Sequence, residues 1–217
     1  MIGGGDPAPA FALPAVNRPG TVELAAFRDR THVLLGLLRG IYCPFCSRHL
    51  AQIETVAAEV RESGVTTVVV MTTPAERARL YIRHRPLSAI LASDPEMTVH
   101  RAFGLPRPER GEGPTVWPRT LGAADYASTR SNPTGEFAEP VPLSDAGTLL
   151  NRVDGFAMDE GDAREAQAIW NQLSGMYLID RAGLVRWRFI EAEAGPAGIG
   201  QTPAPALLRQ TVLAALA

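Results

Sequence analysis

The chain has 217 residues, of which 46% are hydrophobic and 20% charged, and its formal net charge is −2. This composition is that of a globular rather than a disordered protein, and the charge gives no electrostatic reason to expect nucleic acid or an anionic membrane as a partner. Every strongly basic residue is an arginine, which excludes Schiff-base chemistry through lysine.

The N-terminal segment predicts an extended hairpin. Residues 3–19 are rich in Gly, Pro and Ala, and Phe11 and Leu13 alternate with small residues, as in a strand with one buried side. A turn signal at residues 18–20 precedes a short strand at residues 21–24. The N-terminus lacks the features of a signal peptide, and no apolar run approaches the roughly 20 residues of a membrane helix. We therefore expect a cytoplasmic protein with no membrane partner.

An apolar run at residues 33–38 predicts a buried strand that leads to the only two cysteines, Cys43 and Cys46. The run breaks at residues 39–40. Pro44 suits the first position of a helix, because its fixed φ fits there and its missing N–H would have had no partner. Apolar residues then recur at helical spacing until a glycine ends the run: Leu50, Ile53, Ala57, Val60 and the terminating Gly64.

The position of Cys43 just before this helix predicts a reactive thiol. Unpaired backbone N–H groups and the positive end of the helix dipole favour the thiolate, and the pKa of such cysteines falls from about 8.5 to roughly 3.5–7.5. Cys46 lies one turn into the same helix, within reach of Cys43. Because disulfide exchange needs a low-pKa attacker and a second thiol, we expect Cys43 to be the nucleophile and Cys46 the resolving thiol.

Three other interpretations of the pair compete. A closed zinc site needs four Cys or His ligands, and His49 is the only imidazole nearby, so a metal site is disfavoured. Free cysteines are often buried and inert, but this spacing between a strand and a helix is typical of redox sites. A structural disulfide is disfavoured because nothing suggests export to an oxidising compartment.

The following segments alternate between strands and helices. Residues 65–71 are β-branched and almost continuously apolar, as expected of an interior parallel strand. Residues 73–76 have the pattern of an N-cap, a first-turn proline and an acid, and predict a helix that stops before Pro86. A short strand is expected at residues 87–92 and a further helix at residues 94–102.

Residues 105–142 interrupt this alternation with seven prolines and several glycines. A connection of this length without elements is unusual in a compact domain, and the aromatic residues Trp117, Tyr126 and Phe137 argue against disorder. We expect an ordered insertion that packs on its own domain or on a partner subunit, so a homodimer is one arrangement to consider. The sequence does not indicate whether the insertion covers the cysteine site.

After the insertion, residues 162–173 predict a helix, residues 176–179 and 184–190 an antiparallel hairpin, and residues 203–217 a final helix. The order of elements predicts one α/β domain over residues 1–217, with a mixed central sheet and helices on both faces. A CxxC motif at the end of the first long strand of such a unit is the signature of a thioredoxin-like fold.

Four motifs match the pattern of a known family: residues 6–14, 39–46, 94–104 and 177–187. Together they resemble the peroxiredoxin-like branch of the alkyl-hydroperoxide-reductase and thiol-specific-antioxidant (AhpC/TSA) proteins. The resemblance implies a thioredoxin fold, an antioxidant activity in which a thiolate reduces peroxides or disulfides, and no cofactor. It also implies a thiol reductant as partner, either a thioredoxin- or glutaredoxin-type protein or a small thiol.

The chain departs from this family pattern near the cysteines. Standard peroxiredoxins carry a proline seven residues, and a Thr or Ser three residues, before the reactive cysteine, where this chain has Gly36 and Gly40. The arginine that usually precedes the glycine of the late strand is replaced by Ser174. Met176 stands near the position where thioredoxins have a cis-proline.

Three further residues near the cysteines have two interpretations each. Arg39 either stabilises the thiolate or a peroxide oxygen, or it pairs with a carboxylate or a backbone carbonyl. Tyr42 either hydrogen-bonds a peroxide or is half-buried packing. His49 lies one turn beyond Cys46 and is expected on a solvated helix face.

We therefore expect a peroxiredoxin-like thiol oxidoreductase with the catalytic residues Cys43, Cys46, Arg39 and Tyr42, in which Cys43 passes through a sulfenic acid before Cys46 resolves it. One alternative is a thioredoxin-type reductase of protein disulfides that uses the same cysteines. A second alternative is a non-catalytic redox-sensing or interaction module.

Overall fold

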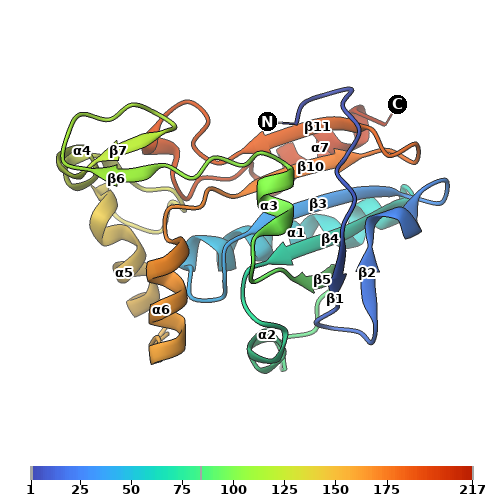
Figure 1. The fold of residues 1–217 in the computed structure, drawn as a ribbon, viewed down its shortest axis with the longest axis horizontal. Coiled ribbons are helices and arrows are strands. Elements are labelled where there is room, and N and C mark those ends of the chain that lie inside the picture. The colour runs from blue at the N-terminus through green and yellow to red at the C-terminus, as the bar shows by residue number, and fades with distance from the viewer. Residues whose placement is uncertain (1, 84, 217) are drawn as a thin grey trace.

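The structure, a computed structural model, describes residues 2–83 and 85–216. Its centre is a five-stranded mixed sheet of β3 (His32–Leu38), β4 (Val65–Met71), β5 (Ile90–Ser93), β10 (Gly175–Ile179) and β11 (Val185–Ile190). The strand order is β11-β10-β3-β4-β5 (Figure 1). Strands β3, β4 and β5 are parallel, whereas β10 is antiparallel to β3 and to β11. The predicted α/β fold with a mixed sheet is confirmed.

Helices cover both faces of the sheet because successive side chains of a strand point to opposite sides. Leu34 and Leu38 of β3 pack in a core with α1 and α7, whereas Leu35 and Leu37 pack in a second core with α3 and the N-terminal segment. These helices are α1 (Pro44–Glu62), α3 (Thr98–Ala102) and α7 (Pro205–Ala214). Strand β3, which precedes the cysteines, is thus packed against a hydrophobic core on each face.

The N-terminal hairpin consists of β1 (Ala12–Pro14) and β2 (Thr21–Glu23), which pair antiparallel as predicted. It lies beside the edge strand β5, where Ala15 forms a bridge with Ala92. The hairpin therefore covers the edge that the last parallel strand would otherwise leave unpaired.

Two helices begin differently from the sequence prediction. Helix α2 (Ala75–Ile82) has no side-chain cap, because the hydroxyl of Thr73, the predicted cap, accepts a hydrogen bond from the backbone N–H of Ile41 at 3.0 Å instead. Helix α3 begins at Thr98 rather than at Asp94. The Asp94 carboxylate instead accepts a hydrogen bond from the N–H of Val99, at 2.8 Å, across the start of the helix.

The inserted segment contains short elements: β6 (Glu109–Gly111), β7 (Thr120–Gly122), α4 (Ala123–Ser128), β8 (Arg130–Ser131) and β9 (Val141–Pro142). It leads into α5 (Leu143–Val153), which the sequence analysis did not predict. Helix α6 (Glu160–Ile169) begins and ends earlier than the predicted residues 162–173. Figure 1 shows α4, α5, α6, β6 and β7 gathered on the left, beyond the end of the sheet from which α1 starts.

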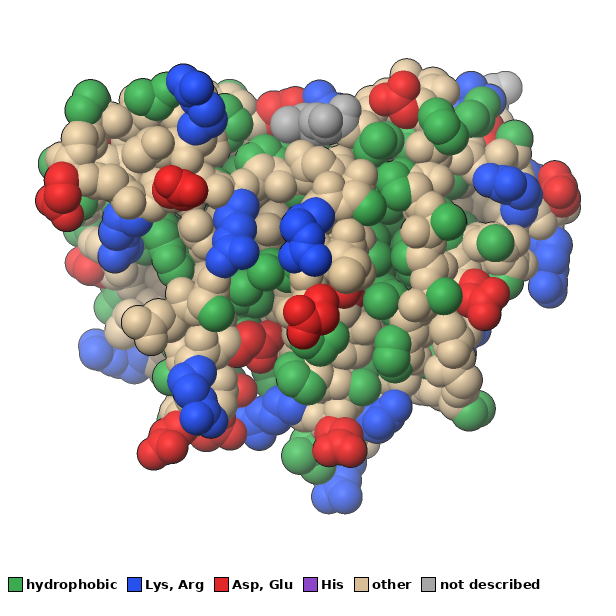
Figure 2. All heavy atoms as spheres, in the orientation of Figure 1, with side chains coloured by type: hydrophobic (Ala, Val, Ile, Leu, Met, Phe, Trp, Pro, Cys, Tyr) green, Lys and Arg blue, Asp and Glu red, His purple; other side chains and the backbone are tan. Residues whose placement is uncertain are grey.

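The C-terminal part agrees with the predicted hairpin followed by a helix. Residue 217, the last of the predicted final helix, and His84 lie outside the described residues. Within residues 2–83 and 85–216, no helix is long and apolar enough to cross a membrane. On the face shown in Figure 2, acidic and basic side chains are interspersed among hydrophobic ones.

Candidate active site

Cys43 lies where the chain passes from the central strand into the long helix. Its backbone is extended (φ −89°, ψ 109°), and it is the N-cap residue of α1, with Pro44 as the first helical residue. Its sulfur accepts a hydrogen bond from the backbone N–H of Cys46 at 3.3 Å. The predicted placement of the thiol at the N-terminus of a helix is confirmed.

Arg39 combines both interpretations that the sequence left open. Its Nε donates to the sulfur of Cys43 at 3.2 Å, while Nη1 and Nη2 hold the carboxylate of Glu191 at 3.0 and 2.9 Å. Nη1 also donates to the carbonyl oxygen of Gln172 at 2.6 Å. Arg39 is only 3% exposed, so the guanidinium is a fixed, buried cation beside the sulfur.

These surroundings separate the two thiols chemically. Burial raises the pKa of Cys43, but hydrogen bonding from the Cys46 thiol and the charge and hydrogen bond of Arg39 outweigh it and lower the pKa to about 6. Burial and the neighbouring Cys43 thiolate raise the pKa of Cys46. Both cysteines are free. At neutral pH the pair is therefore a thiolate at Cys43 and a thiol that donates to it at Cys46.

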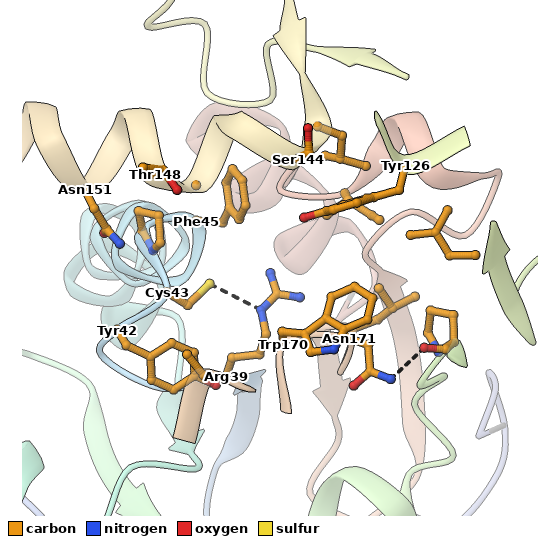
Figure 3. A pocket seen from close by; sticks show the side chains of 18 of the residues that line it. Arg39, Tyr42, Cys43, Phe45, Tyr126, Ser144, Thr148, Asn151, Trp170 and Asn171 are labelled. Atoms are coloured by element: carbon orange, nitrogen blue, oxygen red, sulfur yellow. Dashed lines mark hydrogen bonds between the residues drawn. The ribbon is translucent and has the colours of Figure 1, made fainter. Parts of the chain in front are cut away.

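Cys43 and Arg39 lie on the wall of a cavity of about 300 Å³ (Figure 3). The opposite walls come from the inserted segment and the two helices that follow it. Aromatic rings line much of the space: Tyr42, Phe45, Tyr126 and Trp170. Polar groups are contributed by Ser144, Thr148, Asn151 and Asn171. Cys43 therefore contacts the space between the walls, whereas Cys46 does not line it.

The sequence analysis missed most of this cavity. Trp170 and Tyr126 pack together with their ring centroids 5.9 Å apart, and Arg110 stacks on both rings at 4.6 and 4.8 Å from their centroids. Asn171 donates to the carbonyl of Pro108 at 2.6 Å, which ties the end of α6 to the insertion. The aromatic residues of the insertion were the only feature of the sequence that could have indicated this wall. No pattern in the neighbouring residues shows that they face the cysteines.

Tyr42 lines the cavity and is 4% exposed. Its hydroxyl is buried without a hydrogen-bond partner among the described residues, and burial followed by the two nearby sulfurs raises its pKa. The phenol is therefore neutral, and its O–H has no hydrogen-bond acceptor among the described residues.

The expectation for His49 is wrong. It is 1% exposed and faces the interior of the protein. Its Nε2 lies 3.0 Å from the carbonyl oxygen of Gly200, and its Nδ1 lies 3.3 Å from the hydroxyl of Ser174. The segment after β11 and the residue before β10 therefore cover this side of α1. The spacing of residues within α1 alone does not predict this cover.

The two glycines that depart from the family pattern occupy crowded positions. A Cβ on Gly36 would lie 2.9 Å from Ile53 of α1. A Cβ on Gly40 would lie 2.4 Å from the Tyr42 ring and 2.6 Å from the Thr73 hydroxyl. The space that a Ser or Thr side chain would need at Gly40 is thus filled by other residues.

The side chains of the described residues include no group of three or more His, Cys, Asp or Glu arranged to hold a metal ion. The polar groups around Cys43 instead form a hydrogen-bonded set centred on a sulfur and a guanidinium. This arrangement can activate a thiolate and donate hydrogen bonds to a bound oxygen.

Comparison with known proteins agrees with this chemistry. The sequence model of the Redoxin family matches residues 4–125. The structure is similar to one described as a thiol:disulfide interchange protein DsbE from Chlorobium tepidum (19% identity, TM-score 0.55, 100% of both chains covered). It is also similar to peroxidoxin BcpB from Mycobacterium tuberculosis (16%, 0.58, 100% of this chain and 97% of that chain) and to the reduced 2-Cys peroxiredoxin of Plasmodium vivax (13%, 0.58, 97% and 94%). Identities this low show a shared fold alone, and no curated protein matches the sequence.

Proposed function

This chain belongs to the Redoxin family, and from that premise we propose that it is a thiol-dependent peroxidase whose nucleophile is Cys43 and whose resolving thiol is Cys46. Family membership supports a thiol oxidoreductase in general. The choice of a peroxide as substrate rests on the surroundings of Cys43 described above.

The proposed reaction has two steps within the protein. The Cys43 thiolate attacks one peroxide oxygen, the O–O bond breaks, and the products are Cys43 sulfenic acid and an alkoxide or hydroxide that takes up a proton. The Cys46 thiol then attacks the sulfenic sulfur, which forms the Cys43–Cys46 disulfide and releases water. Two external thiol groups, from two small thiols or from one thioredoxin- or glutaredoxin-type protein, then reduce this disulfide to the dithiol by exchange and are themselves oxidised to a disulfide.

One observation carries this proposal: the thiolate and the guanidinium face the same cavity. A guanidinium has five N–H donors, and the hydrogen bonds of Arg39 to Cys43, Glu191 and Gln172 use four of them. The remaining N–H is on Nη2. In Figure 3 the guanidinium of Arg39 lies in the space next to the Cys43 sulfur. A peroxide oxygen bound there would receive a hydrogen bond as negative charge develops on it.

The burial of both sulfurs favours a small substrate over a protein disulfide. Cys43 is 5% and Cys46 4% exposed, and the approach to Cys43 is through a cavity of about 300 Å³. A disulfide held on the surface of another protein would require the insertion and α5 to move away. A hydroperoxide can enter without such a rearrangement.

The test is peroxide consumption by the reduced protein, with dithiothreitol as the reductant. We expect turnover by the wild type and none by Cys43→Ser. Cys46→Ser, reduced first and then freed of dithiothreitol, should consume one equivalent of peroxide and keep a sulfenic acid that reacts with dimedone. Reduction of insulin disulfides without peroxide consumption would instead assign the thioredoxin-type alternative. A Cys43 inert to both substrates would favour a non-catalytic redox-sensing role.

A further inference from the structure

Glu191 is a wholly buried carboxylate at the centre of five hydrogen bonds. It directly follows β11 and is 0% exposed. Its Oε1 accepts from Arg39 Nη2 at 2.9 Å and from the N–H of Gly200 at 2.6 Å. Its Oε2 accepts from Arg39 Nη1 at 3.0 Å and from both the N–H and the hydroxyl of Ser174, each at 2.7 Å. All five partners are donors, which a carboxylate can satisfy and an amide cannot.

We propose that Glu191 is the positioning residue of this site: it fixes the guanidinium of Arg39 in the orientation in which Nε donates to the sulfur of Cys43. The inference deepens the proposed function, since it concerns how the nucleophile of that reaction is kept activated. Glu191 itself does not line the cavity and makes no contact with a substrate there.

The geometry explains why such a residue is needed. An arginine side chain has several rotatable bonds, and a single contact from Nε to a sulfur does not fix the plane of the guanidinium. Two parallel hydrogen bonds to a carboxylate do fix it, because the fork of the guanidinium matches the two carboxylate oxygens. The carbonyl of Gln172 adds a third fixed acceptor on Nη1.

Glu191 is in turn held by parts of the chain that are remote from the cysteines. The donors from Ser174 come from the start of β10, and the donor from Gly200 comes from the segment before α7. Burial raises the pKa of Glu191, but the charge of Arg39 and the hydrogen bonds outweigh it and lower the pKa to about 2. The carboxylate is therefore charged throughout the pH range in which Cys43 titrates.

The direction in which the pKa of Cys43 changes when Glu191 is replaced distinguishes a positioning role from a simple counter-charge. If Glu191 acted only as a counter-charge, it would partly cancel the stabilisation of the Cys43 thiolate by the Arg39 cation. Removing Glu191 would then lower the pKa of Cys43. As a positioning residue, Glu191 keeps the Arg39 guanidinium where it stabilises the thiolate, so its loss raises the pKa of Cys43. The other ionisable groups that face Cys43, the Cys46 thiol and the Tyr42 phenol, are unchanged in the comparison.

The experiment is the pH dependence of Cys43 alkylation by iodoacetamide in the reduced full-length protein, read at Cys43 by mass spectrometry. We expect the midpoint to rise by about 1 pH unit or more in Glu191→Gln and in Glu191→Asp, which corresponds to about tenfold less thiolate below the midpoint. Glu191→Asp keeps the buried charge but is too short for the paired contact, and it carries the test if Glu191→Gln does not fold.

The matched control is Glu193→Gln, because Glu193 is a carboxylate of the same segment that pairs with Arg188 at 2.7 Å and is more than half exposed. Its midpoint should equal that of the wild type. An unchanged midpoint in Glu191→Asp, or a lower one in Glu191→Gln, would overturn the inference. Because alkylation reports the thiolate and not turnover, a protein that fails to reduce peroxide but shows these shifts would disprove the proposed function and leave this inference standing.

Discussion

Arg48 and Glu136 are 88 positions apart in the chain and are joined by two hydrogen bonds, of 2.5 and 2.7 Å. Arg48 lies on α1 one turn after Pro44, and Glu136 lies in the inserted segment. The same guanidinium also binds Asp154, just beyond α5, at 2.8 and 3.0 Å. One arginine next to the CxxC motif thus fastens two of the segments that enclose the cavity.

The first prediction concerns this fastening. Replacing Arg48 with methionine should lower the free energy of unfolding by only about 1 kcal/mol, because the carboxylates are partly exposed and such pairs contribute little. The local effect should be larger: we expect limited proteolysis to cleave residues 130–142 several-fold faster. The control is Arg61→Met, at an exposed position in the last turn of the same helix. Equal cleavage rates in the two variants would show that Arg48 does not hold the insertion.

The second prediction is the pH profile of Cys43. Its pKa in the folded protein is lowered from 9.0 to about 6, so the thiolate fraction rises as the pH rises through 6 and is nearly complete at pH 8. Alkylation and peroxide consumption should follow the same curve. Cys46, whose pKa is raised, should stay unmodified over this range. A midpoint near 9, seen in stopped-flow alkylation of the native protein, would contradict the activation of this thiol.

The third prediction isolates the contribution of Arg39. In Arg39→Met the burial of Cys43 remains but the cation and the Nε–H donor are lost, so the pKa of Cys43 should rise by about 1–3 units. Peroxide consumption at pH 6.5 should fall by at least tenfold and recover in part at pH 9. Arg39→Lys keeps the positive charge but should recover little of the peroxide consumption. A lysine ammonium cannot contact Cys43, Glu191 and Gln172 with the fork geometry of the guanidinium. Full activity of Arg39→Met at pH 6.5 would exclude this role.

Much of the fold could be predicted because its signals are local. The position of Cys43 follows from a buried strand, a proline at the first helical position and apolar residues at helical spacing. The terminal hairpin of β10 and β11 follows from two strands around a short turn. Helix α5 lies outside the predicted elements although Leu143, Ala146 and Leu150 form its buried stripe, because it directly follows a proline-rich stretch and has no side-chain cap to mark its start.

The site could be predicted only where its parts are close in sequence. The CxxC pair and Arg39 fall within eight residues of one another, but Arg39 finds its carboxylate 152 positions away. His49 was placed on the surface because its partners, Ser174 and Gly200, lie 125 and 151 positions away. Contacts over such separations are set by how the sheet and the C-terminal segment pack together, and no pattern within a single segment records them.

The fourth prediction concerns the aromatic wall of the cavity. In Trp170→Leu, a bulky hydroperoxide such as cumene hydroperoxide loses packing area, and its kcat/KM should fall by about tenfold, as expected for the loss of part of an aromatic contact. Hydrogen peroxide is too small to use this wall, and its kcat/KM should change by less than about twofold. Steady-state assays of both peroxides on the same preparation provide the internal control. A parallel loss with both substrates would mean that Trp170 supports the fold rather than the substrate.

The fifth prediction tests whether the family's hydroxyl can be restored at Gly40. A Cβ there would lie 2.4 Å from the Tyr42 ring, 2.6 Å from the Thr73 hydroxyl and 2.8 Å from the Glu165 carboxylate. Gly40→Ser should therefore lower the free energy of unfolding by about 1–3 kcal/mol, through overpacking, and should slow peroxide consumption by displacing Tyr42. Chemical denaturation and a peroxide assay measure the two effects.

The matched control for Gly40→Ser is Gly113→Ser, since a Cβ on Gly113 meets nothing within 4 Å. That variant should keep wild-type stability and activity, which separates crowding from the general cost of replacing a glycine. If Gly40→Ser were instead as stable as the control and faster with peroxide, the position would have room for a hydroxyl. The site would then work as in standard peroxiredoxins, with Arg39 no longer the main donor to the peroxide. The crowding at Gly40 argues for the opposite result, as the proposed function requires: Arg39, held by Glu191 near the other end of the chain, would donate to the peroxide in place of the missing hydroxyl.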